Sequence, residues 1–116
     1  ATNPMPRFRA RLESDLPWLV TQEDASFHSY AFGTCRQCGA NAELAAEFVR
    51  WLDTHDGGGL QEAETAFRAI AETAKSLQFT LARAARGRRV DVGAPFEHLE
   101  EAWDTAVGIL VKRYGD

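Results

Sequence analysis

Two cysteines, Cys35 and Cys38, are the residues whose type and spacing come closest to a catalytic motif. A Cys-x-x-Cys pair at the start of a helix can be redox-active, because the helix dipole stabilises a thiolate there. Here the pair falls inside an apparent helical run, where that stabilisation is weaker. A zinc site would need a second closely spaced ligand pair. The histidines His28, His55 and His98 are far apart, so we predict no metal site and no cofactor.

A helical thiol oxidoreductase remains an alternative for this motif. The alkyl-hydroperoxidase-D-like proteins carry Cys-x-x-Cys in an all-helical fold, with a glutamate four residues before the first cysteine and a histidine four residues after the second. This sequence has Ala31 and Ala42 at those positions. Because the proton-transfer partners are missing, we interpret Cys35 and Cys38 as small buried hydrophobic residues.

A second group of candidate residues combines a histidine, a phenol and two amides, namely His28, Tyr30, Gln37 and Asn41. Aromatic and small residues surround them on several sides of the same helical segment. Buried polar groups need hydrogen-bond partners, so we expect these four side chains to form a buried structural network. The alternative is that they line a pocket.

A basic cluster follows near the end of the third helical segment and consists of Arg83, Arg86, Arg88 and Arg89. One interpretation is a docking patch for an acidic partner, such as a phosphopantetheine carrier domain or nucleic acid. The other is that the cations interact favourably with the helix C-terminus. The formal net charge of −4 and the isoelectric point near 5.4 argue against nucleic acid as the main partner.

The elements that would position these residues are four predicted helices, separated by glycine and proline. The first begins at Pro6 and is disrupted at Pro17; the second has an N-cap at Thr21 and ends at the three glycines 57–59. We expect Gly39 to bend or split this long second helix. The third helix ends at Gly87, and the fourth begins at Pro95.

The third helix has the clearest apolar pattern, with steps of three and four residues that are typical of a bundle seam. The seam consists of Leu60, Ala63, Phe67, Ile70, Ala74, Leu77, Leu81 and Ala84. Strand-like alternation is not sustained in any segment, and short connections favour antiparallel neighbours. We therefore predict an all-α, up-and-down four-helix bundle. It forms a single domain, residues 1–116, which we expect to be excised from a longer protein.

The length of 116 residues suffices for one hydrophobic core without disulfides or metals. No apolar run approaches the length that spans a bilayer, and the N-terminal residues lack the features of a signal peptide. Two cysteines are too few for a disulfide framework and fit a reducing compartment. We therefore expect a cytoplasmic protein that binds neither membrane nor nucleic acid.

Several runs of the sequence match a pattern that extends over most of the chain. They are Phe27-His28-x-Tyr30-Ala31-Phe32, Arg36-Gln37-x-Gly39-Ala40-Asn41-x-Glu43, Arg50-Trp51-Leu52, Ala74-Lys75-x-Leu77-Gln78-Phe79-x-Leu81-Ala82-Arg83 and Ala102-Trp103-Asp104. In these runs the chain resembles the C-terminal helical region of a bacterial family of unknown function. Its longer members are encoded near amino acid:carrier-protein ligases.

The resemblance implies a protein whose N-terminal half is similar to cysteine-peptidase-like acyltransferases, which would move an aminoacyl group from a carrier thioester. This chain lacks that half, so no nucleophile is carried over to Cys35 or Cys38. We expect a non-catalytic helical module that packs against the missing N-terminal domain or another protein partner, with an acidic carrier protein as one candidate. The alternatives are a helical thiol oxidoreductase and a homodimeric structural bundle.

Overall fold

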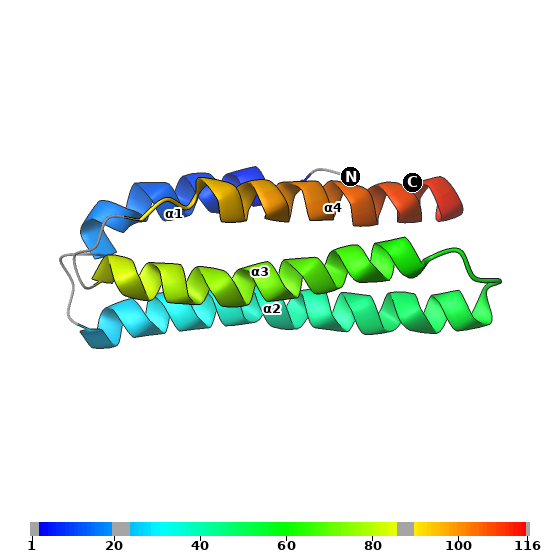
Figure 1. Ribbon diagram of the computed structural model, residues 1–116, viewed down its shortest axis with the longest axis horizontal. Coiled ribbons are helices and arrows are strands. Elements are labelled where there is room, and N and C mark those ends of the chain that lie inside the picture. The colour runs from blue at the N-terminus through cyan, green and yellow to red at the C-terminus, as the bar shows by residue number, and fades with distance from the viewer. Residues whose placement is uncertain (1–2, 20–23, 86–89, 116) are drawn as a thin grey trace.

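The computed structural model describes residues 3–19, 24–85 and 90–115; for residues 15–19, 24–32 and 85 it describes the backbone alone. Within these ranges it contains the helices α1 (Met5–Leu19), α2 (Asp24–His55), α3 (Gln61–Ala85) and α4 (Gly93–Tyr114) (Figure 1). The described part of the chain has no strand. The predicted all-α, up-and-down bundle is confirmed.

Helix α3 lies at the centre of the packing, because it contacts both α2 and α4 extensively. All eight residues of its predicted seam are buried, including Ile70 at 2% exposure and Leu77 and Leu81 at 0%. The apolar stripe of α4 faces the same core through Phe96, Leu99 and Ala106. The core therefore runs along α3 for its whole length.

Helix α1 covers only part of the bundle. It has 15 residues against 32 in α2, which corresponds to roughly 22 Å against 48 Å. Figure 1 shows α1 beside the N-terminal half of α4, while α4 alone continues over α2 and α3 towards the C-terminus. The phenyl rings of Phe8 and Phe96 fix this contact edge to face, with centroids 5.1 Å apart.

The start of α1 is fixed by Asn3. Its Oδ1 accepts a hydrogen bond from the Met5 backbone N–H at 2.9 Å, while its Nδ2 donates to the Glu100 carbonyl at 3.1 Å and to Asp104 Oδ1 at 2.9 Å. An asparagine that caps a helix start satisfies a free backbone donor. The helix consequently begins at Met5, one residue before the predicted Pro6, and is anchored there to α4.

Gly39 does not split α2, which continues through this residue without interruption. A Cβ atom at Gly39 would lie 3.8 Å from both the Ala71 carbonyl oxygen and the Ala74 Cβ, which is ordinary contact. The helix ladder can span one glycine at a cost of about 1 kcal/mol, and packing against α3 supplies more than that. The predicted cap at Thr21 and end at Gly87 lie outside the described residues.

The turn between α2 and α3 holds the C-terminal end of α4. Gly57, Gly58 and Gly59 all have φ near +80° to +90°, a conformation that strains other residues. Arg113 donates hydrogen bonds to the Gly58 carbonyl at 2.8 Å and to the Asp56 carbonyl. These bonds join the C-terminal end of α4 to the turn between α2 and α3.

Candidate functional site

Cys35 and Cys38 lie on adjacent turns in the middle of α2, and their environments differ. Cys35 is 1% exposed, whereas Cys38 is half-buried. Burial, with a smaller contribution from the Cys38 thiol, raises the pKa of Cys35 to about 12. Burial also raises the pKa of Cys38. Because the thiolate is the reactive form, both thiols are protonated and weakly nucleophilic near neutral pH.

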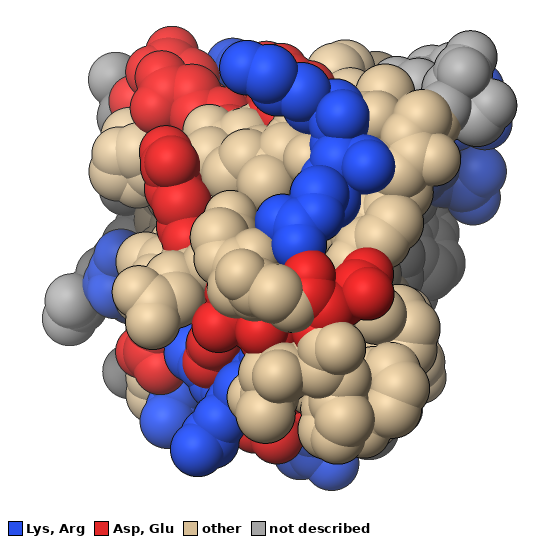
Figure 2. Space-filling model, turned by 90° about the vertical axis from the view of Figure 1, so that its right-hand side faces the viewer, with Lys and Arg blue, Asp and Glu red and all other residues tan. Residues whose placement is uncertain are grey.

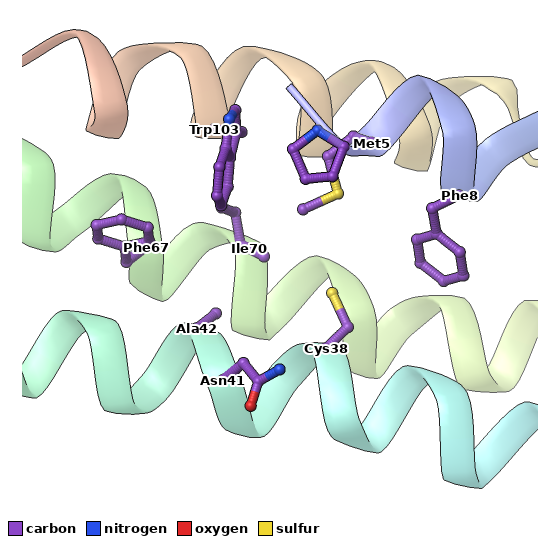
Figure 3. Close-up of a pocket in the computed structure, with 9 residues that line it drawn as sticks. Met5, Phe8, Cys38, Asn41, Ala42, Phe67, Ile70 and Trp103 are labelled. Carbon is purple, nitrogen blue, oxygen red and sulfur yellow. The ribbon is translucent and has the colours of Figure 1, made fainter. Parts of the chain in front are cut away.

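Cys38 lines a crevice of about 430 Å³ between the helices. Figure 3 shows its walls, to which Met5 and Phe8 of α1, Cys38 of α2 and Trp103 of α4 contribute. The remaining wall residues are Pro4, Asn41, Ala42, Phe67 and Ile70. All nine side chains are uncharged, so the crevice is an apolar space with exposed Pro4 and Asn41 at its rim.

The amide pair was expected to be buried or else to line a pocket. The first expectation is wrong for both residues, whereas Asn41 does line the crevice. Gln37 and Asn41 are exposed, and Gln37 Nε2 donates a hydrogen bond to Asn41 Oδ1 at 2.9 Å. The physical reason is their position on α2, since both lie outside the face that Cys35, Ala42 and Val49 turn towards α3. The side chains of His28 and Tyr30 lie outside the described residues.

A second apolar region lies on the outer side of α2 and consists of Leu44, Phe48 and Trp51, which we call the aromatic face. These side chains are 70%, 60% and 54% exposed. The Phe48 and Trp51 rings stack at 6.3 Å between centroids, and Trp51 stacks on His55 at 4.5 Å. Three large apolar side chains thus remain in solvent in a fixed arrangement.

The aromatic face continues into a hollow at the end of the bundle, of about 400 Å³. The hollow is lined by Phe48, Leu52, Leu110, Val111, Tyr114 and Gly115. It and the crevice both open along α2, roughly 15 Å apart by the helical rise over ten residues. Residues of α2 and α4 line both spaces, and the hollow lies in the part of the bundle that α1 does not cover.

The aromatic face was not predicted from the sequence, although the sequence contains a signal for it. Leu44, Phe48, Trp51 and His55 recur at steps of four, three and four residues, which places them on one side of a helix. Ala42 and Val49 lie on another side of the same helix and are buried. A second stripe on the same helix indicates a second contact surface.

Of the predicted basic cluster, Arg83 is exposed and donates a hydrogen bond to Thr80 Oγ1 at 3.2 Å. Arg86, Arg88 and Arg89 lie outside the described residues. Another basic feature lies at the opposite end of the bundle. Figure 2 shows a band of Lys and Arg side chains across this end, beside uncharged and acidic surface.

The part of the chain that the structure describes contains no group of three or more His, Cys, Asp or Glu side chains that could hold a metal ion. No helix in it is long and apolar enough to cross a membrane. The three features that stand out among the described residues are apolar, namely the crevice, the aromatic face and the end hollow.

Comparison with known proteins gives one match. The model of the DUF1839 C-terminal domain family matches residues 1–112. No curated protein and no solved structure matches the chain. Because the family model covers almost the whole sequence, the chain belongs to the DUF1839 C-terminal domain family.

Proposed function

We propose that this member of the DUF1839 C-terminal domain family is a non-catalytic docking module whose aromatic face binds the N-terminal region of the longer family protein. The observation that carries the proposal is the exposure of Leu44, Phe48 and Trp51 beside the end hollow. Contiguous apolar surface of this kind is typical of protein interaction sites. Tryptophan and tyrosine dominate the binding energy of many interfaces.

The arrangement of these side chains favours binding over chance exposure. Phe48 stacks on Trp51, and Trp51 stacks on His55, whose Nδ1 lies 2.9 Å from the Trp51 carbonyl oxygen. Side chains that are already held in place lose less conformational entropy when a partner covers them. The hollow beside Phe48 would receive an apolar side chain from that partner.

The choice of partner follows from the family description and from the packing of α1. A C-terminal domain is by description one part of a longer protein. Asn3 is held against α4 through Glu100 and Asp104, next to the open half of the bundle. A region that precedes the domain would thus lie close to the uncovered side of α2. By the resemblance above, that region would act on carrier-bound aminoacyl groups, and the bundle would position it.

The thiol pair supports a non-catalytic role. Burial keeps both thiols protonated near neutral pH, so the thiol-oxidoreductase alternative lacks an activated nucleophile. Ala31 and Ala42 occupy the positions where that class has its proton-transfer residues. This leaves protein contact as the better supported role.

The test uses the N-terminal region of the longer family protein, produced separately and titrated into this 116-residue chain by calorimetry. Phe48→Ser with Trp51→Ser should weaken binding by at least about tenfold, because interface aromatics contribute 2 kcal/mol or more. Phe79→Ser is the matched control, since Phe79 is 61% exposed but lies near the other end of α3. It should bind as the unmodified chain does.

Equal affinity of the double variant would overturn the proposal. Light scattering of the unmodified chain tests the homodimer alternative, because our proposal predicts that the chain is a monomer. A dimer that the double variant dissociates would assign the aromatic face to a second copy instead. An acidic carrier domain serves as a third titrant, and tighter binding of it to the same face would also overturn the choice of partner.

A further inference from the structure

The crevice between the four helices is a separate feature from the aromatic face. Its volume of about 430 Å³ falls in the range of small-molecule sites, which are concave, mostly apolar and frequent between the helices of bundles. Protein interiors are otherwise packed with few voids larger than a water molecule. A space of this size, with walls from all four helices, is therefore a candidate binding site.

The residues of α2 create this space because they are small. Cys38 and Ala42 face the crevice from α2, opposite the larger Phe8 and Trp103 (Figure 3). Leucine at either α2 position would extend into the gap. The bundle thus has small side chains at the two positions where larger ones would close the crevice.

Two observations define the chemistry of a ligand. The nine wall residues are uncharged, so a charged group would lose hydration without gaining a partner. The Nε1–H of Trp103 is buried and has no hydrogen-bond acceptor among the described residues. In Figure 3 this nitrogen lies at the α4 end of the indole ring. Because this nitrogen is buried, a molecule in the crevice does not reach it, and the indole ring offers that molecule apolar contact only.

We propose that the crevice binds an uncharged, mostly apolar small molecule, which lies against Phe8, Ile70 and Trp103. The site is independent of the aromatic face, so loss of partner docking leaves it intact.

The experiment uses three probes of one shape, namely benzyl alcohol, benzoate and benzylammonium, titrated into the 116-residue chain and followed by NMR. Benzyl alcohol should shift the resonances of Cys38, Ala42 and Ile70 saturably, and both ions should bind at least about tenfold more weakly, since a desolvated charge is costly. Equal binding of an ion, or no saturable shift at these residues, would overturn the proposal.

Two variants fill the crevice, and a third is the control. Ala42→Leu and Cys38→Leu should each abolish binding of benzyl alcohol. Ala40→Leu adds the same side chain to α2 at an exposed position outside the crevice and should bind normally. Retained binding in both filled variants would overturn the assignment.

A chemical measurement is available even where a filled variant fails to fold. Because Cys38 lines the crevice, bound benzyl alcohol should slow its alkylation severalfold in the unmodified chain. An unchanged rate at saturating probe would contradict the proposed location.

Discussion

Helices α2 and α3 lie side by side but use their apolar residues differently. Helix α3 buries one stripe, in which Ile70, Leu77 and Leu81 are 2% exposed or less. Helix α2 buries a stripe against α3 and leaves a second one, with Phe48 and Trp51, more than half exposed. Apart from the isolated exposed Phe79, the large apolar residues of α3 are explained by folding alone. Helix α2 has more apolar surface than this fold covers, which is why we assign docking to it.

The largest effect should come from truncation of the α3 seam. Leu77→Ala is expected to lower the free energy of unfolding by about 2–5 kcal/mol, because it removes a fully buried side chain and leaves a cavity. Urea denaturation measures the loss. A change below about 0.5 kcal/mol, as at an ordinary surface position, would remove the distinction between the two helices.

An intermediate effect is expected where α4 meets the α2–α3 turn. Arg113→Ala removes the hydrogen bonds to the carbonyls of Gly58 and Asp56 and should cost about 1 kcal/mol. Tyr114→Phe removes a hydrogen bond of 2.7 Å to Asp56 Oδ2 and serves as a second variant at the same contact. If thermal denaturation shows no change for either, this end of the bundle is not held by the turn.

The stability of the fold should depend on pH through the buried thiol of Cys35. The pKa of Cys35 is about 12 in the folded chain against 9.0 for an unperturbed thiol. Its contribution to stability is therefore complete below pH 9 and is lost as the pH rises from 9 towards 12, because the unfolded chain releases the proton first. Cys35→Ala should flatten the decline in stability over this range. An equally steep decline would place its cause elsewhere.

The fold was largely predictable from sequence, because an apolar periodicity of three to four residues predicts each helix and its buried side. The α3 seam was identified residue by residue, since Leu60 to Ala84 offer a single apolar side at steps of three and four. Local signals were less decisive: Gly39 does not break α2, because the long contact with α3 outweighs its propensity. Pro17 likewise lies within α1, near its end.

The candidate site was harder to predict, because it depends on what packs beside α2. The burial of Asn41 was inferred from aromatic and small neighbours in sequence, but Asn41 lies outside the side of α2 that packs against α3 and is exposed. The crevice combines residues from Pro4 to Trp103, and no local pattern brings these together. Phe48 likewise lies on the outer side of α2 and is exposed.

Small effects are expected on the outer side of α2. Asn41→Ala removes an exposed hydrogen bond to Gln37 and should change the free energy of unfolding by less than about 0.5 kcal/mol. Phe48→Ser should also leave stability within about that range, because the side chain is 60% exposed. A loss of 2 kcal/mol or more at either position in urea denaturation would show that the outer side of α2 also stabilises the fold, which would contradict its assignment to docking.

Hydroxyl-radical footprinting gives the most direct test of the docking role. The labelling rates of Phe48 and Trp51 are compared between this 116-residue chain and the longer family protein that contains it, with exposed Phe79 as the internal reference. Docking of the N-terminal region predicts that Phe48 and Trp51 are labelled severalfold more slowly in the longer protein, while Phe79 is labelled equally in both. Unchanged rates at Phe48 and Trp51 would contradict the account, because the aromatic face would then be exposed in both proteins.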